Sequence, residues 1–161
     1  MVRRVSVLVV MVMALVAADA VGAILHEANS AYARHPYADA ARVMRAAEQG
    51  NIGAQAQLGL MYSVGYGVPQ DYVLAAKWLQ CAAERGHGGA QLAMGLLHNK
   101  GQGVQTDLVL SYMWLNLSAA QAKGEDRDFR VRLRNAVATK MTVAQVALAQ
   151  QMAMNWYVKP Q

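Results

Sequence analysis

The residues that come closest to a chemical motif are two glycine pairs, in Gly65-Tyr66-Gly67 and in Gly101-Gln102-Gly103. Such a pair can cradle a phosphate when a strand precedes it and a third glycine follows three residues later. Gln70 and Thr106 stand at that third position, and the residues before each pair have a helical pattern. We therefore interpret both pairs as turns between helices, where glycine adopts a positive φ without steric strain.

Other side chains that could support catalysis are few and scattered. The chain contains no Ser-x-x-Lys, Gly-x-Ser-x-Gly or His-Glu-x-x-His motif. The histidines lack the spacing of metal ligands and are interpreted as surface or packing residues: His26, His35, His87 and His98. The single cysteine, Cys81, lies among apolar residues, which predicts a buried side chain; a reactive or dimer-linking thiol is the alternative. The sequence thus predicts a protein that is not an enzyme and needs no metal or cofactor.

Composition and charge narrow the classes of partner. The chain has 161 residues, of which 55% are hydrophobic, and a formal net charge of +5. This length and composition suit one domain or a short array of repeats. No run of five basic residues occurs, so nucleic-acid binding is not predicted. The arginines between residues 127 and 134 are interpreted as a solvated helix face, and contact with an acidic partner or lipid headgroups is the alternative.

A repeat with a fixed period organises the chain. Several residues recur 36 positions later: Ala54-Gln55 as Ala90-Gln91, Gly59 as Gly95, Gly65 and Gly67 as Gly101 and Gly103, Asp71 as Asp107, Trp78-Leu79 as Trp114-Leu115, and Ala83 as Ala119. A constant period between about 20 and 50 residues is typical of helical or solenoid repeats. The repeated tryptophans are interpreted as core residues rather than as platforms for a ligand.

Local chemistry predicts where the helices begin and where they cross. Gly59 and Gly95 lie inside predicted helices, where glycine costs about 1 kcal/mol relative to alanine. We therefore expect a neighbouring helix to cross at each glycine and to leave no room for a side chain. Asp71 and Asp107 are predicted N-caps of the second helix of each pair, and Thr142 is the predicted N-cap of the last helix.

The flanking segments are predicted to close the array. Residues 24–50 have the pattern of a degenerate helix pair that precedes the repeats. After Gly124 the period ends, and two further helices are predicted. A solenoid needs a differently built end to cover its final apolar face, so residues 123–161 are predicted to be capping helices.

The first 23 residues have the pattern of a secretory signal peptide. Two arginines precede an apolar run of about 14 residues, shorter than the ~20 that span a bilayer. The run leads into small-x-small patterns that end at Ala20 and at Ala23, which are alternative cleavage sites. The predicted localisation is periplasmic or secreted. The alternative is a protein anchored in the membrane by residues 5–23, and membrane contact is expected only in that case.

Four motifs of the first unit carry a resemblance to a known family: Ala-Gln-x-x-Leu-Gly-x-Met-Tyr at 54–62, Gly-x-Gly-Val-Pro-Gln-Asp-Tyr at 65–72, Ala-x-x-Trp at 75–78 and Ala-Ala-x-x-Gly at 82–86. The chain resembles exported bacterial Sel1-like repeat proteins of the tetratricopeptide-type superfamily, with repeats at 51–86 and 87–122. The second repeat departs from the pattern at Ala122, where the closing glycine is missing. The resemblance implies an all-α fold, an α-solenoid in which antiparallel helix pairs form a right-handed superhelix.

The resemblance also implies a function and a binding face. The protein would be an adaptor of the bacterial cell envelope that binds a protein or peptide on the concave side, which the first helix of each pair lines. The predicted partner-binding residues are Ala56, Leu60, Ser63, Val64, Leu92, Leu96, Asn99 and Lys100. Exposed apolar side chains there would favour docking; the alternative is that the C-terminal helices cover them. A second hypothesis, by family analogy alone, is a binder or hydrolase of a cell-wall fragment or β-lactam. The partner's identity and the oligomeric state stay open.

Overall fold

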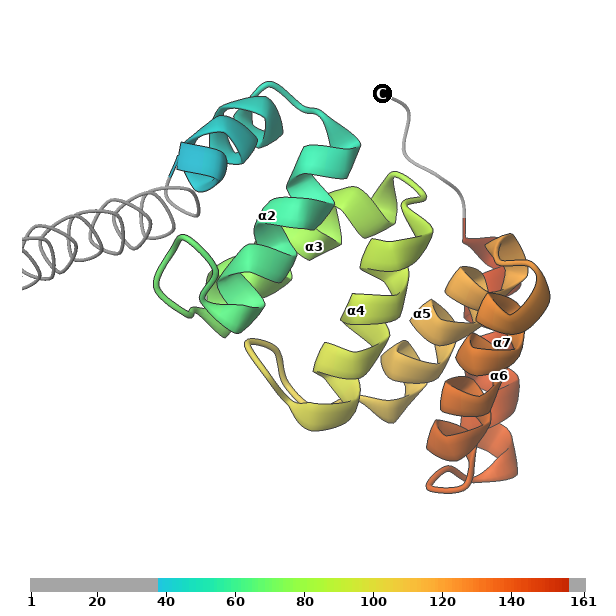
Figure 1. Cartoon of the computed structure of the whole chain (residues 1–161). Coiled ribbons are helices and arrows are strands. Elements are labelled where there is room, and N and C mark those ends of the chain that lie inside the picture. Colours follow the sequence, from blue (N-terminus) through green and yellow to red (C-terminus); the bar gives the residue numbers. More distant parts are fainter. Residues whose placement is uncertain (1–37, 157–161) are drawn as a thin grey trace, which may run out of the picture. The chain divides into compact units, whose positions relative to one another are not determined.

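In this computed structural model, residues 38–156 are described, and every regular element among them is a helix (Figure 1). The helix over residues 38–48 is followed by α2 (Ile52–Val64), α3 (Tyr72–Glu84), α4 (Gly88–Lys100), α5 (Leu108–Gln121), α6 (Gly124–Ala138) and α7 (Val143–Asn155). The labelled helices belong to one unit, Asp39–Gln161. The predicted all-α fold of paired helices is confirmed. The predicted signal peptide and the first part of the predicted N-terminal pair lie outside the described residues.

The helix ends follow from the local sequence. Asp71 accepts hydrogen bonds from two amides at the start of α3, at 2.8 and 2.9 Å, and Asp107 accepts one at the start of α5, at 2.9 Å. Thr142 caps α7. Helices α2 and α4 end at Gly65 and Gly101, whose φ angles of 75° and 68° lie in the left-handed region. The predicted caps and glycine turns are therefore confirmed.

The pairs α2–α3 and α4–α5 each cross closely at a glycine. A Cβ atom added to Gly59 would lie 2.5 Å from Leu79 Cγ of α3, and one added to Gly95 would lie 2.6 Å from Leu115 Cγ of α5. Non-bonded carbon atoms repel each other strongly at such distances, so an added methyl group would force the neighbouring helix to shift. The predicted crossing at both glycines is confirmed.

Successive units are joined by a hydrogen bond that repeats every 36 residues. The Gln55 side-chain amide donates to the Ala47 carbonyl at 3.2 Å, and the Gln91 amide donates to the Ala83 carbonyl at 3.2 Å. Each glutamine lies near the start of a unit and reaches back to the end of the preceding helix. The helix over residues 38–48 is therefore joined to α2 in the same way as α3 is joined to α4.

Helices α6 and α7 both pack against α5 and cover that end of the array. Leu115 of α5 lies in one core cluster with Val137 of α6 and Ala149 of α7. Trp114 of α5 meets Trp156, just after α7, edge to face with 6.0 Å between ring centroids. The predicted C-terminal capping helices thus bury the last face of the repeats.

The prediction that Cys81 is buried is wrong, because its side chain is exposed. The matching residue of the second repeat, 36 positions later, is Leu117, which packs against the cluster that contains Trp114 and Ala153. Helix α7 packs against α5, and so contributes to the cover of Leu117. Apolar sequence neighbours alone do not reveal which copy of a repeated position receives such a cover.

Candidate interaction face

The predicted binding residues that reach solvent cluster toward the C-terminal ends of α2 and α4. Leu60 is 49% exposed and Val64 is 71% exposed. Lys100 is exposed, while Ser63 and Leu96 are half-buried. We call the surface formed by Leu60, Ser63, Val64, Leu96, Asn99 and Lys100 the α2–α4 face.

The earliest predicted position in each helix is covered, and one of the two predictions is wrong. Ala56 is only 3% exposed and lies in a core cluster with Ala90 and Met94 of α4. Leu92, its counterpart in the second repeat, is half-buried and packs against a cluster that includes Val137 of α6. In each case the cluster contains residues of the next unit. Ala56 therefore cannot contact a partner, and Leu92 is available only in part.

The turn that follows α6 also reaches the far end of the α2–α4 face. The Lys140 ammonium group donates a hydrogen bond to the Asn99 side-chain oxygen at 3.1 Å. At the end of α2, the Ser63 hydroxyl donates to the Leu60 carbonyl at 2.7 Å, and the Gln70 amide donates to the Ser63 carbonyl at 2.8 Å. These polar groups bind to the chain itself, which leaves apolar side chains as the main features open to a partner.

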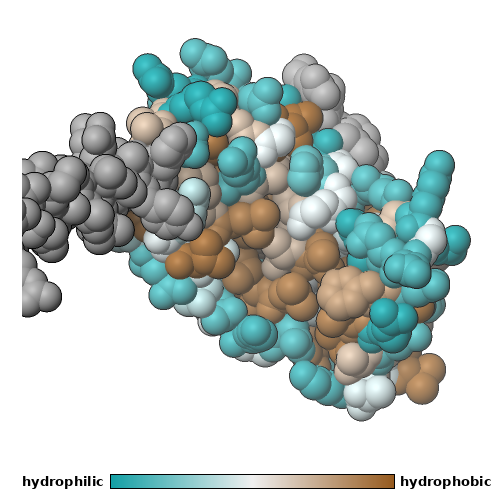
Figure 2. Space-filling view, viewed as in Figure 1, coloured by the Kyte–Doolittle hydropathy of each residue, from teal (hydrophilic) through white to brown (hydrophobic). Residues whose placement is uncertain are grey.

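The α2–α4 face is uncharged over most of its area. Helix α2 contains no charged residue, and α4 carries only His98 and Lys100, in its last turn. Figure 2 shows apolar side chains gathered across the middle of the face that Figure 1 presents. Exposed Phe129 of α6 lies one helical turn before Leu133, which packs in the same region as Leu92. The exposure of Phe129 was not predicted, because the repeat pattern does not extend into α6.

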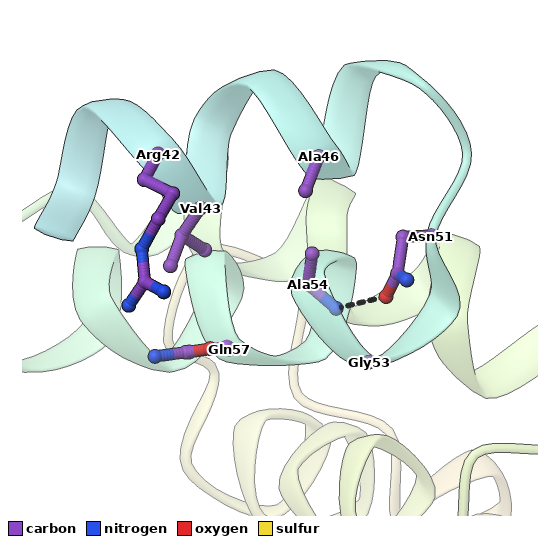
Figure 3. Close-up of a pocket in the computed structure, with 7 residues that line it drawn as sticks. All are labelled: Arg42, Val43, Ala46, Asn51, Gly53, Ala54 and Gln57. Atoms are coloured by element: carbon purple, nitrogen blue, oxygen red, sulfur yellow. Dashed lines mark hydrogen bonds between the residues drawn. The ribbon is translucent and has the colours of Figure 1, made fainter.

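A pocket of about 320 Å³ opens between the helix over residues 38–48 and α2 (Figure 3). Its lining residues are Arg42, Val43, Ala46, Asn51, Gly53, Ala54 and Gln57. Asn51 caps α2 by accepting a hydrogen bond from the Ala54 amide at 2.8 Å. Arg42 forms an exposed ion pair with Asp39 at 3.2 Å. The lining offers one cation and two amide side chains, which can bind a carboxylate or a carbonyl but cannot supply a nucleophile.

The pocket was not predicted, since its walls come from two different helix pairs. Only a folded array places the last turns of one helix beside the first turn of the next.

The described histidines have structural roles. His87 caps α4 by accepting a hydrogen bond from the Ala90 amide at 3.1 Å, and His98 Nδ1 lies 3.3 Å from the Gln105 carbonyl oxygen. Over residues 38–156, no three acidic, histidine or cysteine side chains lie together as metal ligands would. None of the helices in this same range has the length and apolar character needed to cross a membrane. His26 and His35 lie outside the described residues.

The fold and this face define a class of protein: an α-solenoid of stacked helix pairs with a solvent-facing apolar surface on its first helices. The family model of the Sel1 repeat matches residues 52–87 and 89–123. The chain therefore contains two Sel1 repeats. Proteins of this type generally act as protein-interaction scaffolds and are typically not enzymes.

Two solved structures are similar to the chain. One is a protective antigen with an SLR fold, present in uropathogenic Escherichia coli strains, with 29% identity and a TM-score of 0.68 over 73% of this chain and 24% of that chain. The other is a Sel1 repeat protein from Oxalobacter formigenes, with 35% identity and a TM-score of 0.51 over 52% of this chain and 63% of that chain. The chain thus spans less than two thirds of the length of either protein. A search of curated proteins found no significant match.

Proposed function

We propose that this protein is a non-enzymatic scaffold that holds a protein or peptide segment on the α2–α4 face. The observation that carries the proposal is the exposure of Leu60 and Val64, at 49% and 71%, on a helix without any charged residue. Apolar side chains that are grouped and exposed often mark a partner site.

A bound segment would use apolar anchors and polar margins. Leu60, Val64 and Leu96 supply the apolar contacts, and an extended or helical segment can place its own apolar side chains against them. Lys100 is the exposed cation of the α2–α4 face, so an acidic residue next to the anchors would find a complementary charge. The pocket that Arg42 lines lies next to the first turn of α2 and could accept a carboxylate of the same segment.

The test is a comparison of two matched surface variants. A photo-crosslinking residue is placed at Val64, and proteins captured from the cell envelope fraction are identified by mass spectrometry. We expect capture by the parent protein, loss of capture with Leu60→Asp and Leu96→Asp, and retained capture with Val73→Asp. Val73 is a fair control because it is 53% exposed, but on α3.

Circular dichroism and thermal unfolding establish that the double variant is folded. A folded double variant that still captures the same partner would refute the proposed face. Capture lost equally with Val73→Asp would show that the substitutions act nonspecifically.

We also propose that the protein is exported to the periplasm or beyond, on the basis of the arginine pair and short apolar run within residues 1–23. The mature N-terminus, determined by mass spectrometry of protein isolated from its own cells, tests this proposal. A chain that begins at Val21 or Ile24 would support cleavage. An intact N-terminus in the membrane fraction would support the membrane-anchored alternative.

A further inference from the structure

We draw no further inference here: the strongest candidate, the pocket between the helix over residues 38–48 and α2, has a counterpart one repeat later that α2 covers through Ala56, but nothing in the part of the chain that the structure describes shows what covers the pocket itself.

Discussion

Trp78 and Trp114 occupy the same repeat position, in α3 and α5, but they differ in burial. Trp114 is buried and packs on Trp156, whereas Trp78 is only partly buried, against the cluster that contains Leu58 and Met61. One residue earlier, the first repeat has exposed Lys77 and the second has buried Met113. Helix α5, in the second repeat, is thus a core element. Helix α3, in the first repeat, keeps one side that is more exposed to solvent.

The first helices of the two repeats differ in a related way. Leu60 is well exposed on α2, but its counterpart Leu96 on α4 is half-buried. Val64 corresponds to Lys100, so the first repeat presents apolar surface where the second presents a cation. Repeated positions therefore have equal local structure and unequal burial, because burial depends on a residue's place in the array.

The largest expected contrast lies in the tryptophans. Trp114→Ala should lower the free energy of unfolding by about 3–5 kcal/mol, the usual cost of removing a buried aromatic side chain. Trp78→Ala should cost less, because less of that side chain leaves water on folding. Urea denaturation followed by circular dichroism measures both. Equal costs would mean that cover by α7 and Trp156 adds nothing to the second repeat.

Substitutions at the two crossing glycines should show that the helices of a pair pack equally closely in both repeats. Gly59→Ala and Gly95→Ala should each cost about 1–3 kcal/mol through overpacking. The gain of about 1 kcal/mol in helix propensity offsets part of this cost, so the free energy of unfolding should fall by up to about 2 kcal/mol. Gly53→Ala is the control in α2, because its added Cβ would meet only Asn51 Oδ1, at 3.4 Å. Chemical denaturation that finds Gly59→Ala or Gly95→Ala as stable as the control would contradict the close crossing.

The N-cap residues of α3 and α5 should differ in how much they stabilise the protein. Asp71→Ala should cost about 1–2 kcal/mol and Asp107→Ala about 0.5–1 kcal/mol, within the usual range for caps. The difference is expected because Asp71 accepts two amide hydrogen bonds and Asp107 accepts one. Thermal unfolding of both variants at one pH gives the comparison, and Asn at either position should restore most of the loss. A larger loss at Asp107 would contradict this order.

The smallest effect is expected at Cys81. Cys81→Ser should change the free energy of unfolding by less than about 0.5 kcal/mol, as at other exposed sites. Leu117→Ser, at the matching position of α5, should cost more because Leu117 packs against the core. In the native protein, a thiol reagent should label Cys81 nearly as fast as in denaturant. Labelling that requires unfolding would contradict the exposed position of Cys81.

Features within a unit could be predicted from the sequence. The period of 36 residues, the glycine turns, the aspartate caps and the crossings at Gly59 and Gly95 each depend on residues close together in one repeat. The binding face was predicted less well. Leu60 and Val64 are exposed as expected, but Ala56 is buried because α4 contributes Ala90 and Met94 to the same cluster.

The pocket between the helix over residues 38–48 and α2 could not be inferred for the same reason, since no repeat contains both of its walls. Phe129 lies in α6, where the period has ended, so no repeated pattern indicated its exposure.

The sequence by itself determined the helix pairs and their ends, because caps, turns and tight crossings are specified by residue type within one unit. Only the tertiary structure decided which copy of a repeated position is buried. Cys81 and Leu117 share a position, but α7 packs against α5 and helps to cover only the second. Burial depends on the neighbouring repeats, and the residues of one repeat do not specify which helices pack against it.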